Sequence, residues 1–400
     1  MAEYLAIYCV AHQPRRVKLP AQPIPRGASP EDIERCLFDE RMNERYFRKV
    51  AQWCYYPATE MWLRLLDRGM SLSLGFSLSL IRQMQRWDPA LLQLFQRLVA
   101  HPRCELVAVE PYHSFLMFID LPYFGQRMRE ACEELERLFG KRPVVADTTE
   151  MAMSDPICDT LRRAGFRAGM LDGRPWVLEW RESTHLYHHG GLKLLPRHFE
   201  LSDDVGYRFS NRQWPGYPLM APTYAHWLRE AWGDLVFLAW DYETFGEHHS
   251  RDTGIFEFME HLPDELQKRG ITCLTVGGAV EQFWDRSYEL PLGPFASTWA
   301  GSGGMEFFLG NSAQQALFQL MLAAYNKAKL TGDPKLLDLA LWLIQSDNLH
   351  LIQWYGRAGS EAEVSAYFTP QEWWALGPHG IIWEQQCVYR NFIAALEPYV

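Results

Sequence analysis

Short apolar runs with strand character alternate with amphipathic helical patterns along most of this chain. Runs of alternating or β-branched apolar residues predict eight strands, at residues 4–10, 71–79, 105–109, 144–147, 168–171, 192–195, 235–240 and 271–276. Amphipathic stretches at 88–99, 125–139 and 255–269 lie between them, and the last two stop at a glycine. Strands that alternate with helices form parallel sheets covered on both faces. Seven or eight such units favour a barrel over an open sheet.

The character of the sequence changes after residue 294. Residues 313–330, 334–345 and 381–395 predict helices, whereas 354–380 is aromatic, lacks periodicity and is expected to be a loop-rich insertion. We therefore expect an α/β barrel over 1–294 and an α-helical domain over 295–400.

Composition restricts the classes of partner. The formal net charge of −10 disfavours nucleic acid and anionic membrane surfaces, whereas a neutral sugar chain meets no electrostatic penalty. No G-x-G-x-x-G or P-loop motif is present, and no signal peptide or spanning segment is expected. The eight cysteines are scattered without a C-x-x-C pair, which favours reduced thiols in a cytoplasmic protein.

Ionisable side chains follow several of the predicted strands. In a parallel barrel, the catalytic groups lie at the carboxyl ends of the strands. His12 follows the first strand, His113 the third, Glu150 the fourth and Asp241 the strongly apolar strand at 235–240. Two carboxylates across a cleft are what glycoside hydrolysis requires, one as nucleophile or base and one as acid. From the residues alone, Glu150 could equally be a helix-start carboxylate, and the two histidines could be structural.

The motifs around these residues resemble glycoside hydrolase family 57, and its α-amylase branch in particular. The matching segments are His12-Gln13-Pro14, Tyr112-His113-Ser114, the approach to Thr149-Glu150, the run from Asp241 to His248, Leu201-Ser202-Asp203-Asp204 and Phe308-Leu309-Gly310-Asn311. The resemblance implies an incomplete (β/α)7 barrel with a C-terminal helical domain and a retaining mechanism on α-1,4-glucans or maltooligosaccharides. It implies Glu150 as nucleophile and Asp241 as general acid/base, with His12, His113 and His248 on sugar hydroxyls. Neither a metal nor a cofactor is expected.

Four aromatic residues complete the predicted site. Trp180, Trp214 and Trp299 are candidates for stacking on sugar rings, because flat apolar sugar faces pack well on indoles. Tyr242, next to Asp241, is a further candidate for substrate binding.

The chain also departs from the family pattern. Asp147 and Thr148 stand where amylase members usually carry Arg-Asn, and an acid facing the site at 147 would raise the pKa of Glu150. The segment at 301–306 lacks the usual Asp and Arg.

Three alternative functions therefore stay open. They are a 4-α-glucanotransferase with the same two carboxylates, a non-catalytic α-glucan-binding protein, and a metal-dependent deacetylase. The deacetylase would draw on Asp203-Asp204 and on His185, His188 and His189.

Overall fold

The computed structural model describes all 400 residues, and their contacts divide the chain into two compact units. The first unit contains residues 1–13, 46–111 and 122–299, and the second contains 14–45, 112–121 and 300–400. The expected single boundary after residue 294 does not capture this division, because the segments that follow the first and third strands fold with the C-terminal helices.

The first unit is built on seven mainly parallel strands. They are β1 (Tyr4–Ala11), β2 (Leu72–Phe76), β3 (Cys104–Val107), β4 (Val145–Ala146), β5 (Ala168–Asp172), β7 (Leu192–Arg197) and β8 (Leu235–Asp241). Parallel pairing gives the order β3-β2-β1-β8 in one sheet and β4-β5-β7 in the other. A parallel bridge between Ala108 and Ala146 joins β3 to β4, and the His198 N–H donates to the Phe237 carbonyl (2.8 Å) beside β7 and β8. The predicted incomplete (β/α)7 barrel is thereby confirmed.

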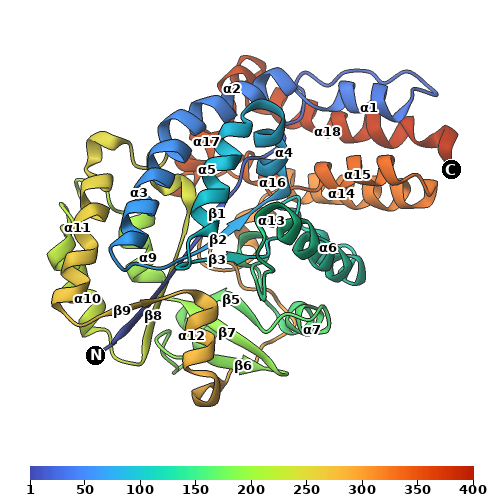
Figure 1. Ribbon diagram of the computed structural model, residues 1–400. Coiled ribbons are helices and arrows are strands. Elements are labelled where there is room, and N and C mark those ends of the chain that lie inside the picture. The colour runs from blue at the N-terminus through green and yellow to red at the C-terminus, as the bar shows by residue number, and fades with distance from the viewer. The chain divides into compact units, whose positions relative to one another are not determined.

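Strand periodicity divides the side chains of β1 between two cores. Leu5, Ile7 and Cys9 belong to the core under the outer helices, whereas Tyr8 belongs to the core inside the barrel. Figure 1 shows helices α3, α10 and α11 on the outer side of β1 and β8. The Tyr8 hydroxyl donates to Asp147, so it lies near the carboxyl end of β4.

Helices and three short strands complete this unit. The helices are α3 (Tyr56–Asp67), α4 (Leu78–Trp87), α5 (Pro89–Ala100), α6 (Leu121–Phe139), α7 (Asp155–Arg163), α8 (Pro175–Leu178), α9 (Phe199–Gly206), α10 (Ala221–Glu230), α11 (Ile255–Lys268) and α12 (Val276–Gln282), and the strands are β6 (Tyr187–His189), β9 (Thr272–Leu274) and β10 (Tyr288–Glu289). The strand predicted at 71–79 ends early because the Ser77 hydroxyl accepts the Leu80 N–H and caps α4.

The second unit is helical. It contains α1 (Pro30–Leu37), α13 (Glu306–Leu309), α14 (Ser312–Thr331), α15 (Pro334–Leu343), α16 (Asp347–His350), α17 (Ser360–Phe368) and α18 (Gly377–Ala395), and α2 (Glu40–Val50) spans the division. The loop predicted at 354–380 is wrong in part: α17 lies inside it, and it buries too few residues to show a helical period. No helix in the protein combines the length and the apolar character needed to cross a lipid bilayer.

Candidate active site

Glu150 lies in a strained turn directly after β4. Its φ of 58° and the φ of 53° at Met151 place two consecutive non-glycine residues in the left-handed region, at a cost of about 1 kcal/mol each. Paired backbone bonds between Met153 and Ser297 hold the turn, and the Trp299 N–H donates to the Glu150 carbonyl (3.2 Å). Strain of this kind, held in place by surrounding bonds, is typical of functional sites.

The Trp299 indole also contacts the side chain of Glu150. Its Nε1–H donates to Glu150 Oε2 at 2.9 Å. A donor of this kind stabilises a carboxylate more than a carboxylic acid. The structure therefore gives Trp299 a contact with Glu150 that the sequence did not predict.

Asp241 is the last residue of β8 and pairs with Val10 near the end of β1. The six preceding residues of β8 are buried, whereas Asp241 is half-buried. Asp241 therefore lies at the carboxyl end of the barrel strands, as does Glu150 just after β4.

Two further acids lie within electrostatic range of Asp241. Burial raises the pKa of Asp147 to about 7 and that of Glu243 to about 8, and the charge of Asp241 adds to both shifts. The Tyr8 hydroxyl donates to Asp147 Oδ2 at 2.7 Å, while Tyr55 and the His12 N–H (3.2 Å) donate to Glu243. Below about pH 7 Asp147 is mainly neutral, so it places little charge near Glu150 despite replacing an expected arginine.

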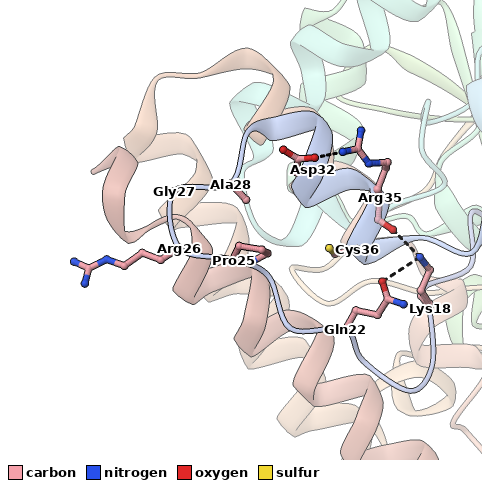
Figure 2. A pocket seen from close by; sticks show the side chains of 9 residues that line it. All are labelled: Lys18, Gln22, Pro25, Arg26, Gly27, Ala28, Asp32, Arg35 and Cys36. Carbon is pink, nitrogen blue, oxygen red and sulfur yellow. Dashed lines mark hydrogen bonds and ion pairs between the residues drawn. The ribbon is translucent and has the colours of Figure 1, made fainter.

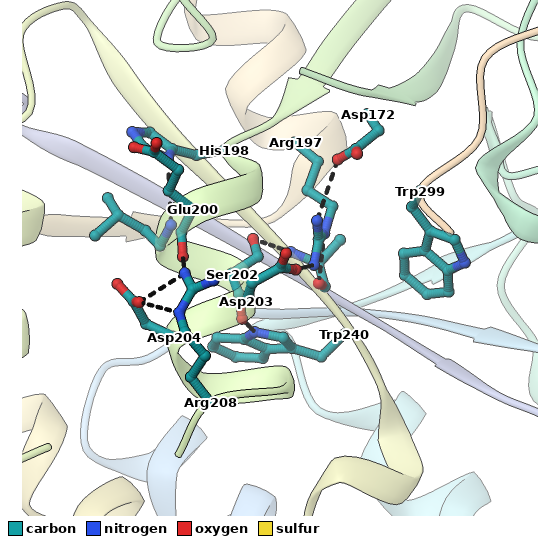
Figure 3. Close-up of polar contacts among 12 residues, drawn as sticks. Asp172, Arg197, His198, Glu200, Ser202, Asp203, Asp204, Arg208, Trp240 and Trp299 are labelled. Carbon is teal, nitrogen blue, oxygen red and sulfur yellow. Dashed lines mark hydrogen bonds and ion pairs between the residues drawn. The ribbon is translucent and has the colours of Figure 1, made fainter. Parts of the chain in front are cut away.

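A buried arginine, Arg197, lies among Asp172, Asp203 and Trp299, as Figure 3 shows. Arg197, at the end of β7, donates from Nη1 to Asp172 (3.1 Å), from Nη2 to Asp203 (2.6 Å) and from Nε to the Ala239 carbonyl of β8 (3.0 Å). Its guanidinium also lies 5.7 Å from the centre of the Trp299 ring. A continuous series of contacts therefore runs from Glu150 through Trp299 and Arg197 to β8.

Arg174 adds a second cation to this group. Its Nε donates to Asp172 Oδ2 at 2.5 Å and its Nη2 to the Trp299 carbonyl at 3.1 Å. Asp172 and Arg197 end β5 and β7, so the strand-end rule could have identified both.

Of the predicted site histidines, His12 and His248 lie in the first unit. Both contact Glu243 through the backbone, but their side chains have different environments. His12 bonds the Ser77 hydroxyl through Nδ1 (2.7 Å) and follows β1 directly. The His248 N–H donates to the Glu243 carbonyl (2.9 Å), and burial lowers the pKa of His248 to about 4. A neutral imidazole can both donate to and accept from a sugar hydroxyl.

Tyr242 corrects one prediction. Its ring is fully buried in the core between the barrel and its outer helices, and its hydroxyl bonds Thr59 (2.9 Å). Val236, Leu238 and Trp240 of β8 lie in the same core, and Tyr242, just beyond the end of the strand, continues this outward-facing series.

The other two predicted tryptophans differ in exposure. Trp180 is 80% exposed, with the Arg181 guanidinium 4.7 Å from its ring centre. Trp214 is half-buried and packs edge-on against Trp227 (6.2 Å). The contacts of these tryptophans are with Arg181 and Trp227, and stacking on sugar stays a prediction for both.

His113 belongs to the second unit. It is buried, its Nδ1 bonds the Ser346 hydroxyl (3.0 Å), and its carbonyl accepts the Ser346 N–H (2.9 Å). His113 also has a positive φ of 53°, a conformation that is uncommon outside glycine.

A surface pocket of about 510 Å³ lies in the second unit and contains none of the predicted site residues (Figure 2). Its lining consists of Lys18, Gln22, Pro25, Arg26, Gly27, Ala28, Asp32, Arg35 and Cys36. The Lys18 ammonium bonds the Arg35 carbonyl (2.7 Å), and Arg35 pairs with Asp32. The pocket therefore offers no carboxylate pair for glycoside chemistry.

The histidines considered for a deacetylase do not converge. His185 bonds Asp234 (3.2 Å), His188 bonds Ser287 (3.1 Å) and His189 bonds Asp155 (2.8 Å). Asp203 pairs with Arg197 instead of with any of them. This arrangement does not form the ligand set that the deacetylase hypothesis needs.

The fold and the site define a class of protein, the incomplete (β/α)7 barrels with one acid after the fourth strand and another at the end of β8. The sequence matches Glycosyl hydrolase family 57 over residues 6–291, and the chain belongs to this family.

Known proteins agree with this assignment. A Methanocaldococcus jannaschii protein named "Putative alpha-amylase" is 34% identical over 288 residues, which are 70% of this chain and 61% of that protein. The chain therefore spans about three-fifths of that relative.

Two solved structures share the fold. A GH57-type branching enzyme from Pyrococcus horikoshii matches with a TM-score of 0.68 at 13% identity, covering 98% of this chain and 95% of that one. The 4-alpha-glucanotransferase from Thermococcus litoralis matches with a TM-score of 0.67 at 14% identity, covering 98% and 60%.

Proposed function

We propose that the protein is a retaining glycoside hydrolase that cleaves α-1,4-glucosidic bonds in glucans or maltooligosaccharides. Glu150 is the nucleophile and Asp241 the general acid/base. The observation that carries the proposal is the different environment of these two acids in a family 57 barrel: an indole N–H bonds Glu150, whereas Asp241 lies among other acids.

These environments suit the two roles. The nucleophile must be ionised, and the Trp299 N–H stabilises that form of Glu150. The acid must carry a proton for the first step, and Asp241 lies close to two carboxyls, Asp147 and Glu243, that themselves hold protons near neutral pH. Attack by Glu150 forms a glycosyl ester while Asp241 protonates the leaving oxygen. Asp241 then removes a proton from water, which hydrolyses the ester with net retention.

The printed names of two relatives support the proposed substrate class. One is named as an alpha-amylase and another as a 4-alpha-glucanotransferase, so both names point to α-glucans. A transferase would use the same carboxylates with a sugar hydroxyl in place of water. We also place the protein in the cytoplasm, on the scattered pattern of its cysteines.

Product analysis on maltoheptaose and soluble starch tests the proposal. The parent should release reducing ends, and Glu150→Gln and Asp241→Asn should each lower kcat by about 10³-fold or more, because each removes a chemical step. Glu257→Gln and Asp252→Asn, at exposed acids outside the site, serve as matched controls and should keep parental activity.

Three results would contradict it. Longer oligosaccharides in place of new reducing ends would identify a transferase. Binding of starch without cleavage would identify a glucan-binding protein. Parental activity in Glu150→Gln would refute the assignment of the nucleophile.

A further inference from the structure

Two exposed aromatic rings flank one imidazole on the surface of the first unit. Trp232 is 70% exposed and Tyr288 is 52% exposed. The His185 ring lies edge-on between them, with centroid distances of 5.4 Å to Trp232 and 5.5 Å to Tyr288. We call these three residues, with Asp234 and Arg286, the Trp232 patch.

The backbone that carries Trp232 is held firmly. The Thr184 hydroxyl donates to the Trp232 carbonyl, and the Asp234 and Leu235 N–H groups both donate to the Thr184 carbonyl (3.0 Å each). Gly233, with a φ of 137°, leaves no room for a side chain, since a Cβ there would lie 2.2 Å from Thr184 Oγ1. Trp232 therefore has a fixed backbone despite its exposed ring.

Tyr288 is also fixed by its backbone. It pairs with Tyr187 where β10 runs parallel to β6, and its N–H donates to the Leu186 carbonyl at 3.0 Å. Rings on a rigid backbone lose little conformational entropy when a ligand packs on them.

Polar groups border the two rings. Asp234 bonds His185 through Oδ2 (3.2 Å) and accepts from Arg286 through Oδ1 (2.6 Å). The Arg286 side chain is largely exposed, so N–H donors remain accessible beside the rings. Aromatic faces with hydrogen-bonding groups at their edge suit a sugar chain, whose rings have apolar faces and hydroxyl rims.

The patch lies far from the acids. Asp234 directly precedes β8, and Asp241 is the last residue of β8. A strand of this length extends about 20 Å, so the patch and the carboxylates are at opposite ends of it.

We propose that the Trp232 patch is a second α-glucan-binding site, which holds a substrate chain on the outside of the barrel. The choice of glucan rests on the proposed function. A second copy of the chain is a poorer occupant, because two rings and an imidazole cover much less than the roughly 800 Å² per partner of a stable interface.

Electrophoresis through native gels that contain amylopectin tests this site. Every variant carries Glu150→Gln as well, so that the polysaccharide in the gel is not consumed. Trp232→Ala and Tyr288→Ala should each raise the dissociation constant for amylopectin by about threefold to tenfold, as expected for loss of one stacked ring. Trp383→Ala and Tyr367→Ala, at rings of the second unit that are 59% and 67% exposed, should leave it unchanged.

Activity on maltoheptaose separates this proposal from the function of the acids. With Glu150 intact, Trp232→Ala should keep kcat/KM on maltoheptaose within about twofold, because this short substrate needs only the acids. Unchanged amylopectin affinity in both patch variants would overturn the second site while leaving the hydrolase intact. A dimer of the parent that dissociates on Trp232→Ala, as measured by sedimentation, would also overturn the second glucan site. If the patch variants lose amylopectin affinity while the parent cleaves no maltoheptaose, the second site is upheld and the hydrolase is refuted.

Discussion

Asp147 makes the stability of the protein depend on pH, because its carboxyl is buried. Burial raises its pKa from the usual 3.8 to about 7. The folded state therefore holds the proton over a range in which the unfolded chain has released it, and stability falls as pH rises from about 4 through about 7. At 1.36 kcal/mol per pKa unit, the total loss is about 4 kcal/mol, and more than half of it falls between pH 5 and pH 8.

Asp147→Asn removes this loss, because an amide does not titrate and its oxygen can still accept the Tyr8 hydroxyl. The difference in unfolding free energy between Asp147→Asn and parent should grow in favour of the variant by about 2–3 kcal/mol from pH 5 to pH 8. Urea unfolding followed by tryptophan fluorescence at several pH values measures this difference. Asp252→Asn, at an exposed acid, is the control and should give a difference independent of pH. A flat difference for Asp147→Asn would show that Asp147 is ionised normally in the folded protein.

Two further substitutions test the bond between Trp299 and Glu150 and the buried ion pairs of Arg197. Trp299→Phe keeps an aromatic ring but removes the N–H that bonds Glu150, so kcat/KM on maltoheptaose should fall by about 10- to 100-fold while circular dichroism shows an intact fold. Parental kinetics in this variant would exclude a role for the bond. Arg197→Met leaves Asp172 and Asp203 without their buried partner and should lower the unfolding free energy by about 3–5 kcal/mol in a urea titration, whereas a loss below about 1 kcal/mol would mean that the network is not buried as described.

The sequence predicted the barrel well because its strands are short apolar runs with clear limits. The predicted strand at 168–171 corresponds to β5 (Ala168–Asp172), and that at 192–195 to β7 (Leu192–Arg197). Both predictions stopped before the charged residue that ends the strand. The strand-end rule could still have identified Asp172 and Arg197, but their burial could not be predicted, since an apolar pattern gives no sign that a strand continues into a buried charge.

Other parts of the site depend on contacts between distant segments. Trp299 was expected to stack on sugar, but its bond to Glu150 arises because residues 297–299 pair with 150–153. The inward direction of Tyr8 depends on the pairing of β1 with its neighbours, which strand periodicity alone does not fix. Tyr242 was assigned to the site from its place next to Asp241, although it continues the outward-facing series of β8 just beyond the end of the strand.

Covalent trapping of the glycosyl-enzyme intermediate tests the central assignment most directly. A slow fluorinated α-glucosyl substrate should leave one sugar attached to the protein, and mass spectrometry of the digest should locate it on Glu150, with retained configuration in the hydrolysis product. A label on Asp147, Asp241 or Glu243, or a product of inverted configuration, would contradict the account.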